Sequence, residues 1–179
     1  LNSMATAQDE EKRNLYYGNS YFDKENYDEA IFYYQEAIAA APLSFKPQFN
    51  MANAYFRKGD FEKAQALYES IVELAPTDYD KSRVYHNLGN THMYNQKLDD
   101  AIDAYKSALR LNPLDEETRY NLAYALFLKQ EQEKQEEQNQ DQNNEDENND
   151  GENNEGQNGS ENQDENGNPQ DENENGDEN

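Results

Sequence analysis

The side chains best suited to bind another molecule in this chain are asparagines that recur at a regular spacing. Two repeated positions carry them, at steps of 34 or 37 residues. The first set is Asn19, Asn53 and Asn90, and the second is Asn50, Asn87 and Asn121. An asparagine amide offers both a donor and an acceptor, so it can pair with a peptide backbone of any sequence. Asparagine is a mediocre helix former, so its recurrence favours a binding groove; a hydrophilic face with no ligand is the alternative.

Aromatic and basic side chains accompany these asparagines. The aromatic set, which would give a ligand apolar contact, is Phe49, Phe56, Tyr120 and Tyr124. The basic set, which occupies one further repeated position, is Lys12, Lys46 and Arg83. A row of cations would favour an acidic or carboxylate-bearing partner. Exposed cations are also common on solvent-facing helices, where an ion pair contributes only about 0.2–1 kcal/mol, so a solvated row with no ligand stays open.

Catalytic chemistry has little support in the sequence. His86 and His92 are the two histidines, and their separation of six residues turns them to different sides of a helix. His92 stands where the repeat has a packing residue, so we expect it in the core. The chain has no cysteine, no glycine-rich phosphate loop and no nucleophile elbow. We therefore predict neither an enzyme nor a bound cofactor.

Two segments near the C-terminus match the opening of a calcium-binding loop, Asp146–Gly151 and Asp171–Gly176. Such a loop needs a glutamate at its twelfth position, but the first segment has Gln157 there and the second stops short of it. In a stretch made mostly of Asp, Glu, Asn and Gln, these matches arise from composition. We predict no specific metal site.

The elements that must position the asparagines are pairs of helices encoded by a repeated pattern of small residues, tyrosines and a closing proline. The first copy carries Gly18, Tyr21, Ala30, Tyr34, Ala37 and Pro42. The second carries Ala52, Tyr55, Ala64, Tyr68, Val72 and Pro76. The third carries Leu88, Gly89, Ala101, Tyr105, Ala108 and Pro113, after three additional residues near Tyr79–Lys81. Small residues let two helices approach closely, and proline ends a helix because it has no N–H donor.

This pattern resembles the tetratricopeptide repeat, whose period is 34 residues. The resemblance implies an all-α solenoid of helical hairpins that holds other proteins in a groove lined by the first helix of each pair. We expect repeats at about 11–44, 45–78 and 82–115 within a domain of residues 9–130. The expected helices are Glu10–Asp23, Tyr27–Ala40, Phe45–Lys58, Phe61–Leu74, Asp78–Asn95 and Leu98–Leu111. A seventh, capping helix should run from an N-cap at Asp115 to about residue 137.

Composition changes sharply near residue 130. Residues 1–130 carry 20 acidic and 14 basic residues, a net charge of −6, and residues 131–179 carry the remaining −18 of the total of −24. Residues 131–179 contain no Ala, Val, Ile, Leu, Met, Phe, Tyr or Trp, so no apolar burial offsets the entropy lost on ordering. We expect residues 131–179 to form a disordered acidic tail, except where the last helix continues to about residue 138. The negative charge disfavours nucleic acid and anionic membranes as partners, and no stretch reaches the ~20 apolar residues of a membrane span.

The first residues resemble the end of a secretory signal, with Ala5-x-Ala7 as the cleavage site before Gln8. Because the sequence opens on Leu1 rather than methionine, we interpret residues 1–8 as a truncated signal and expect an exported protein. A cloning remnant followed by an unstructured N-terminus is the alternative.

Part of the groove resembles the carboxylate clamp of chaperone-binding tetratricopeptide domains, at Asn19, Asn50 and Arg83. The clamp has two further cations, and Leu15 and Asn87 stand in their places. We therefore expect no specific grip on a C-terminal carboxylate, and no cytosolic chaperone adaptor.

A more specific resemblance lies in the third repeat and the residues after it. Its segments are Tyr85–Asn90, Ala101–Pro113 and Thr118–Ala125, followed by a tail rich in Gln, Glu and Asn. This combination resembles the BatC-like tetratricopeptide proteins of the Bacteroides aerotolerance (Bat) operon. The resemblance implies an exported envelope scaffold without enzymatic activity, linked to oxygen or stress tolerance, whose partners are von Willebrand factor A-domain proteins. Two other functions stay open: a periplasmic, chaperone-like binder of extended peptides, and an acidic protein that buffers divalent cations.

Overall fold

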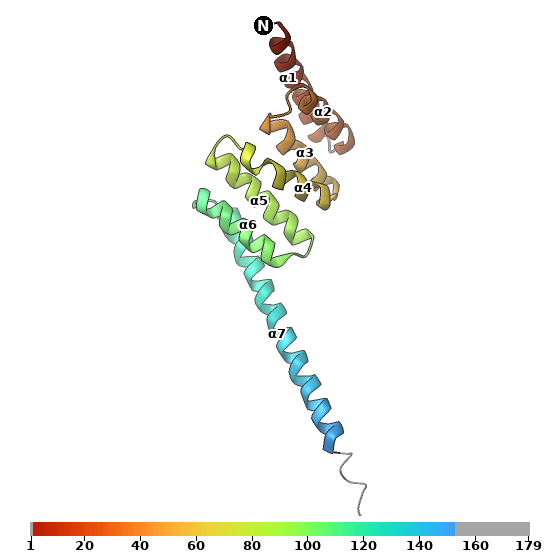
Figure 1. Ribbon diagram of the computed structural model, residues 1–179, viewed down its shortest axis with the longest axis vertical. Coiled ribbons are helices and arrows are strands. Elements are labelled where there is room, and N and C mark those ends of the chain that lie inside the picture. The colour runs from red at the N-terminus through yellow and green to blue at the C-terminus, as the bar shows by residue number, and fades with distance from the viewer. Residues whose placement is uncertain (1, 153–179) are drawn as a thin grey trace, which may run out of the picture. The chain divides into compact units, whose positions relative to one another are not determined.

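The computed structural model describes the backbone of residues 2–152 and the side chains from residue 6 to residue 139. Within that range the chain is all-helical, as predicted (Figure 1). The helices are α1 (Asn2–Phe22), α2 (Tyr27–Ala40), α3 (Phe45–Lys58), α4 (Phe61–Ile71), the short 3₁₀ helix η1 (Val72–Leu74), α5 (Asp78–Tyr94), α6 (Leu98–Leu111) and α7 (Glu116–Glu152).

The first six α-helices form three hairpins, α1 with α2, α3 with α4, and α5 with α6, and consecutive hairpins pack against each other. A residue at the same repeat position closes each hairpin in the left-handed backbone region: Glu25, Gly59 and Gln96, with φ of 58°, 87° and 59°. Small residues mark the crossings, because Ala30, Ala64 and Ala101 have no exposed surface. The repeat pattern therefore predicted the helix pairs and their crossings correctly.

The tyrosines at the repeated position of each second helix fill the hairpins, and their side chains are only about 1% exposed. They are Tyr34, Tyr68 and Tyr105. In the first and third hairpins the ring lies against a glycine: a Cβ added to Gly18 or Gly89 would lie 2.5 Å from the ring of Tyr34 or Tyr105, respectively. Glycine is thus required at these two positions by close contact rather than by backbone conformation.

The three additional residues of the third repeat lengthen its first helix. α5 has 17 residues, whereas α3 has 14. The additional turn includes Tyr79, and Thr77 caps it by accepting a hydrogen bond of 3.0 Å from the backbone N–H of Asp80.

Both ends of the helical region differ from the sequence prediction. α1 begins at Asn2 rather than near Glu10, because residues 2–9 contain neither glycine nor proline and include alanine, methionine and glutamine. α7 continues to Glu152 rather than ending near residue 137, although the segment after residue 138 contains more Asn and Asp, which are mediocre helix formers, than Glu and Gln. The calcium-like segment Asp146–Gly151 lies within that helix and is not a loop.

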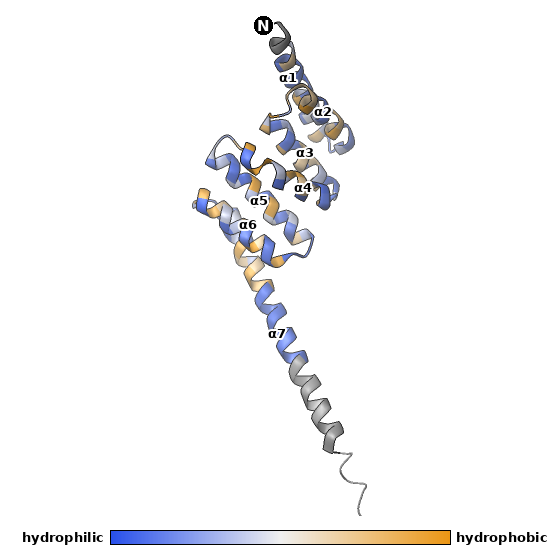
Figure 2. Cartoon of the chain, viewed as in Figure 1, coloured by the Kyte–Doolittle hydropathy of each residue, from blue (hydrophilic) through white to orange (hydrophobic). Residues whose placement is uncertain are grey.

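The chain divides into two units, Leu1–Gln135 and Glu136–Asn179. The three hairpins and the apolar part of α7 belong to the first unit. In α7, a hydrophobic stretch that includes Leu122–Leu128 is followed by hydrophilic residues (Figure 2). The second unit is helical up to Glu152, and residues 153–179, which include the rest of the predicted tail and Asp171–Gly176, lie outside the described residues.

Candidate functional site

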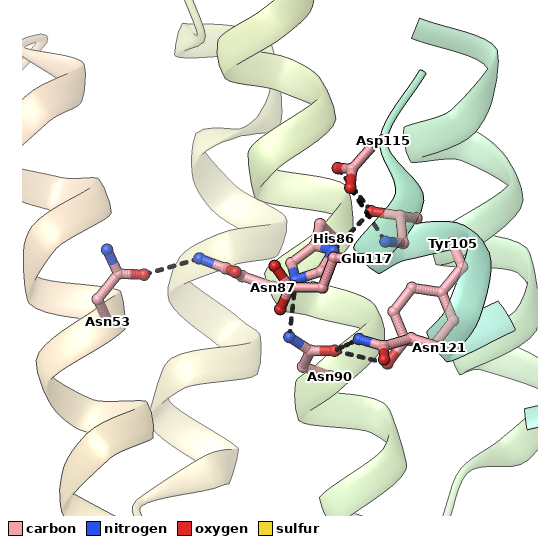
Figure 3. Close-up of polar contacts among 9 residues, drawn as sticks. Asn53, His86, Asn87, Asn90, Tyr105, Asp115, Glu117 and Asn121 are labelled. Atoms are coloured by element: carbon pink, nitrogen blue, oxygen red, sulfur yellow. Dashed lines mark hydrogen bonds and ion pairs between the residues drawn. The ribbon is translucent and has the colours of Figure 1, made fainter. Parts of the chain in front are cut away.

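The asparagines that the sequence predicts to bind a ligand form hydrogen bonds with one another. In the second repeat, the Oδ1 atom of Asn53 accepts a hydrogen bond of 2.5 Å from the Tyr68 hydroxyl. The same Oδ1 accepts a second bond of 2.8 Å from the Nδ2 of Asn87, one repeat further along (Figure 3). Asn53 on α3 thus joins the second helix of its own hairpin to the first helix of the next.

This junction recurs in every repeat. The Oδ1 of Asn19 accepts from the Tyr34 hydroxyl at 2.9 Å and from Asn50 Nδ2 at 2.8 Å. The Oδ1 of Asn90 accepts from the Tyr105 hydroxyl at 2.6 Å and from Asn121 Nδ2 at 3.0 Å. We call the set the asparagine ladder, and it consists of Asn19, Tyr34, Asn50, Asn53, Tyr68, Asn87, Asn90, Tyr105 and Asn121.

The ladder leaves a fixed set of polar atoms for a ligand. A carbonyl oxygen has two lone pairs, so the Oδ1 atoms of the three junction asparagines are fully used. Among the described residues, the amide nitrogens of Asn19 and Asn53 have no partner, and neither do the Oδ1 atoms of their donors, Asn50 and Asn87. Each of the first two rungs therefore presents one donor beside one acceptor, the pair of groups that a peptide unit can satisfy.

Burial keeps the ladder tyrosines in their donor form. Removal from solvent raises the pKa of Tyr34, Tyr68 and Tyr105 well above the ordinary value of 10.0. The nearby Asp23 carboxylate raises the pKa of Tyr34 further. All three hydroxyls therefore remain protonated throughout the physiological range, and the ladder keeps one hydrogen-bonding direction.

Three hollows follow one another along the ladder, with volumes of about 270, 250 and 440 Å³. The first and second share Phe22 and Asn53, and the second and third share Phe56 and Asn90, so together they form one continuous groove. Phe22, Phe56 and Met93 occupy the same repeat position. The groove thus alternates a polar rung with an apolar wall, once per repeat.

The third rung ends in a different network that links α5 to the start of α7. Asn90 Nδ2 donates to His86 Nε2 at 3.0 Å, so the proton of the neutral ring lies on Nδ1. His86 Nδ1 donates to the Thr118 hydroxyl at 2.6 Å, which donates to Asp115 Oδ2 at 2.7 Å (Figure 3). Glu117 Oε1 lies 3.6 Å from His86 Nε2. The Nδ2 of Asn90 is therefore occupied, unlike that of Asn53.

Asp115 caps α7, as predicted, by accepting a bond of 3.0 Å from the Thr118 backbone N–H. Burial alone would raise the pKa of Asp115. The bonds from the Thr118 backbone and hydroxyl outweigh that effect and hold the pKa below 3.8. The Asp115 carboxylate is thus ionised at neutral pH and fixes the start of α7.

The basic row is only partly free to meet a ligand. Lys12 and Lys46 are exposed and have no partner among the described side chains. The guanidinium of Arg83 instead lies 4.7 Å from the Phe49 ring centroid and 5.9 Å from that of Tyr79, and 3.8 Å from an Asp80 oxygen. An acidic partner would therefore have to compete with contacts that Arg83 already makes.

Phe49 does not offer apolar surface to a ligand, contrary to the sequence prediction. Its side chain is 3% exposed and packs edge-on against Tyr68, with ring centroids 6.1 Å apart. The reason is that one helical residue turns the chain by about 100°, so Phe49 faces α4 while Asn50 faces the groove. Phe56 and Tyr124 do line the groove, whereas Tyr120 is 72% exposed and lines none of its three hollows.

Three more residues line the groove, Phe22, Met93 and Tyr94, and the ring of Tyr94 stacks on Phe61 at 4.6 Å between centroids. The period indicates Phe22 and Met93, because they share the repeat position of Phe56, but it does not indicate Tyr94. The hydroxyls of the buried ladder tyrosines gave no such signal, because a tyrosine in a core position reads as packing alone.

His92 is buried, which confirms its predicted place in the core. Its Nδ1 has no hydrogen-bond partner in the structure, and burial lowers the pKa of the ring below 6.5. Over the described part of the chain, no group of three or more His, Asp or Glu side chains is arranged to hold a metal ion. No helix in that part is both long and apolar enough to cross a membrane.

The fold and the site define a class: an all-helical repeat protein with a ligand-sized groove along the first helix of each hairpin. Models of the tetratricopeptide repeat match residues 18–59, 43–113 and 86–141. The chain belongs to the tetratricopeptide repeat family. A comparison with curated proteins gives no match.

Solved structures agree with this assignment. The first tetratricopeptide domain of human RPAP3 is 30% identical, with a TM-score of 0.58, over 70% of this chain and 95% of that one. The first such domain of Spaghetti (RPAP3), bound to the HSP90 peptide SRMEEVD, is 29% identical, with a TM-score of 0.62, over 67% and 93%. The Sgt2 domain from Aspergillus fumigatus shares the fold at 23% identity, with a TM-score of 0.64, over 70% and 82%.

Proposed function

We infer that the groove binds an extended segment of another protein and that the chain acts as a non-enzymatic scaffold. The observation that carries this function is the asparagine ladder, whose first two rungs each present an unpaired donor beside an unpaired acceptor. Neighbouring helices pack about 8–10 Å apart, so three rungs span roughly 20 Å. An extended chain rises about 3.3 Å per residue, and the groove therefore fits a segment of about six residues.

Recognition here should depend on the ligand's backbone rather than on its terminal carboxylate. The relative in the Spaghetti structure holds the peptide SRMEEVD, whose last residue is an aspartate. In this chain Leu15 packs in an apolar cluster and Asn87 is a ladder donor, so neither supplies the cation that a carboxylate clamp has there. With Arg83 resting on Phe49, the groove is better matched to internal segments with apolar side chains spaced to enter its hollows.

A narrower proposal concerns the biological setting. The segments Ala101–Pro113 and Thr118–Ala125 and the polar residues after them resemble BatC-like proteins. On that basis the chain would be an exported component of a Bat-type system that serves the cell envelope and oxygen or stress tolerance. Its groove would then hold a segment of a von Willebrand factor A-domain protein encoded in the same operon.

The binding function can be tested with peptides of about ten residues selected from a random library on the full chain, followed by calorimetric titration. Asn53→Asp keeps the Oδ1 that accepts from Tyr68 and Asn87 but removes the free amide donor. Phe56→Ala removes the wall between two hollows. Each change should weaken binding about tenfold.

Gln35→Ala, on an exposed position of α2, is the matched control and should leave the affinity unchanged. Failure to select any peptide, or equal loss in the control, would refute groove binding. Titration of the same variants with the von Willebrand factor A-domain protein encoded in the same operon tests the Bat-type proposal. Tight binding to many unrelated peptides but none to that domain would favour the chaperone-like alternative.

A further inference from the structure

An exposed apolar stripe runs along the part of α7 that follows the third hairpin. Tyr120 is 72% exposed, Phe127 is 55% exposed, and Ala123 between them is also exposed. These three residues hold the same repeat positions as three residues of α3, which are Phe49, Ala52 and Phe56. In α3 they form the face that packs against α4.

The comparison with α3 shows what the stripe lacks. Phe49 is 3% exposed and Ala52 has no exposed surface, because the Ala64 and Tyr68 side chains of α4 cover them. α7 is thus the first helix of a hairpin, and no second helix covers it among the described residues. Residues 131–179 contain no Ala, Val, Ile, Leu, Met, Phe, Tyr or Trp side chain with which to cover the stripe.

The stripe is complementary to itself when two copies run antiparallel. With the twofold axis near residue 125, Phe127 of each copy lies over Ala123 of the other. A large ring over a small residue is the contact that Tyr34 makes with Gly18 and Tyr105 makes with Gly89. The chain already uses this geometry in its own hairpins.

Charge selects the antiparallel arrangement over the parallel one. Glu116 and Lys134 lie at opposite ends of the stripe and on the same side of the helix, because 18 residues make five full turns. An antiparallel pair places Glu116 of each copy opposite Lys134 of the other, whereas a parallel pair places like charges together. Among the side chains that the structure describes, Lys134 pairs with Glu131 of its own helix, in an exposed contact of 2.8 Å that is easily exchanged.

We propose that α7 is a self-association surface through which two copies of the chain form an antiparallel, twofold-symmetric dimer around Ala123 and Phe127. A twofold interface joins the same patch on both subunits, which is what this self-complementary stripe requires. This inference does not depend on what the groove binds.

Sedimentation equilibrium of the full chain, from about 5 to about 200 µM in about 150 mM salt, tests the proposal. The expected species has twice the 20.8 kDa of one chain. Phe127→Glu should raise the dimer dissociation constant at least about tenfold. Phe32→Glu is the matched control, because Phe32 is also 55% exposed but lies on α2, and it should leave the constant unchanged. Circular dichroism verifies that both variants remain helical.

A charge exchange and a cross-link test the orientation. Lys134→Glu should weaken the dimer, and adding Glu116→Lys to the same chain should restore it. Because the chain has no cysteine, Ala123→Cys and Phe127→Cys chains of different tag length can be mixed and oxidised. The disulfide between one chain of each variant should predominate over the disulfide between two chains of the same variant. A single 20.8 kDa species at every concentration, species larger than a dimer, or dissociation caused by Phe32→Glu would each overturn the proposal.

Discussion

Replacing Asn53 by leucine should destabilise the fold because Asn53 is the central junction of the ladder. Its Oδ1 accepts from Tyr68 at 2.5 Å and from Asn87 at 2.8 Å, and leucine has a similar size but no acceptor. Each hydrogen bond contributes about 0.5–1.5 kcal/mol net, so two losses amount to about 1–3 kcal/mol. The Tyr68 side chain is 1% exposed, and its hydroxyl would be left without a partner, which favours the upper half of that range.

Urea unfolding followed by far-ultraviolet circular dichroism measures this loss. With a slope of about 2 kcal/mol per molar urea, a loss of about 2 kcal/mol lowers the midpoint by about 1 M. Asn53→Asp retains both bonds to Oδ1, so its free energy of unfolding should lie within about 0.5 kcal/mol of that of the natural chain. Gln35→Leu, an exposed polar-to-leucine change on α2, should also change the free energy of unfolding by no more than that.

The order of the urea midpoints of these variants is the decisive result. If Asn53→Leu unfolds at the same urea concentration as the natural chain, the ladder does not stabilise the fold and its asparagines are held only for a ligand. An equal loss in Asn53→Asp and Asn53→Leu would mean that the amide nitrogen, not the Oδ1, carries the stabilising contact.

Two further predictions concern the core. Gly89→Ala should destabilise the chain by about 1–3 kcal/mol, because the added methyl would lie 2.5 Å from the Tyr105 ring, and a variant with an unchanged melting temperature would contradict that contact. Burial lowers the pKa of His92 in the folded chain, so the unfolded chain binds more protons once the pH falls below about 6.5. The unfolding free energy should therefore decline from pH 7.5 to pH 5.5, and it should decline less in His92→Leu. Urea titrations at the two pH values measure both declines, and an equal decline in the two chains would refute this.

Much of the fold could be predicted because repeat spacing reports directly on helix packing. Ala30, Ala64 and Ala101 are small and periodic in the sequence, and all three are fully buried at hairpin crossings in the structure. The helix ends at Asn2 and Glu152 were not predicted, because the prediction rested on the repeat spacing and both ends lie outside the repeats.

The site was predicted less completely than the fold. The asparagines selected by the period line the hollows of the groove, but the period also placed Phe49 beside them, although Phe49 is buried under Arg83. A period assigns residues to equivalent positions and does not say which side of the helix meets a neighbour. That choice depends on how α3, α4 and α5 pack together.

The sequence by itself determined the helix pairs, the glycine and alanine crossings, and the identity of the amides along the first helices. These follow from local spacing, since equal spacing places residues on equivalent helix faces. Only the tertiary structure decided which amide atoms remain free. Asn53 and Asn87 lie on the first helices of consecutive hairpins, and the packing of these hairpins brings the Nδ2 of Asn87 to the Oδ1 of Asn53. The orientation of each amide is fixed by its partners across the helices, and those partners are set by packing between repeats rather than by any single segment.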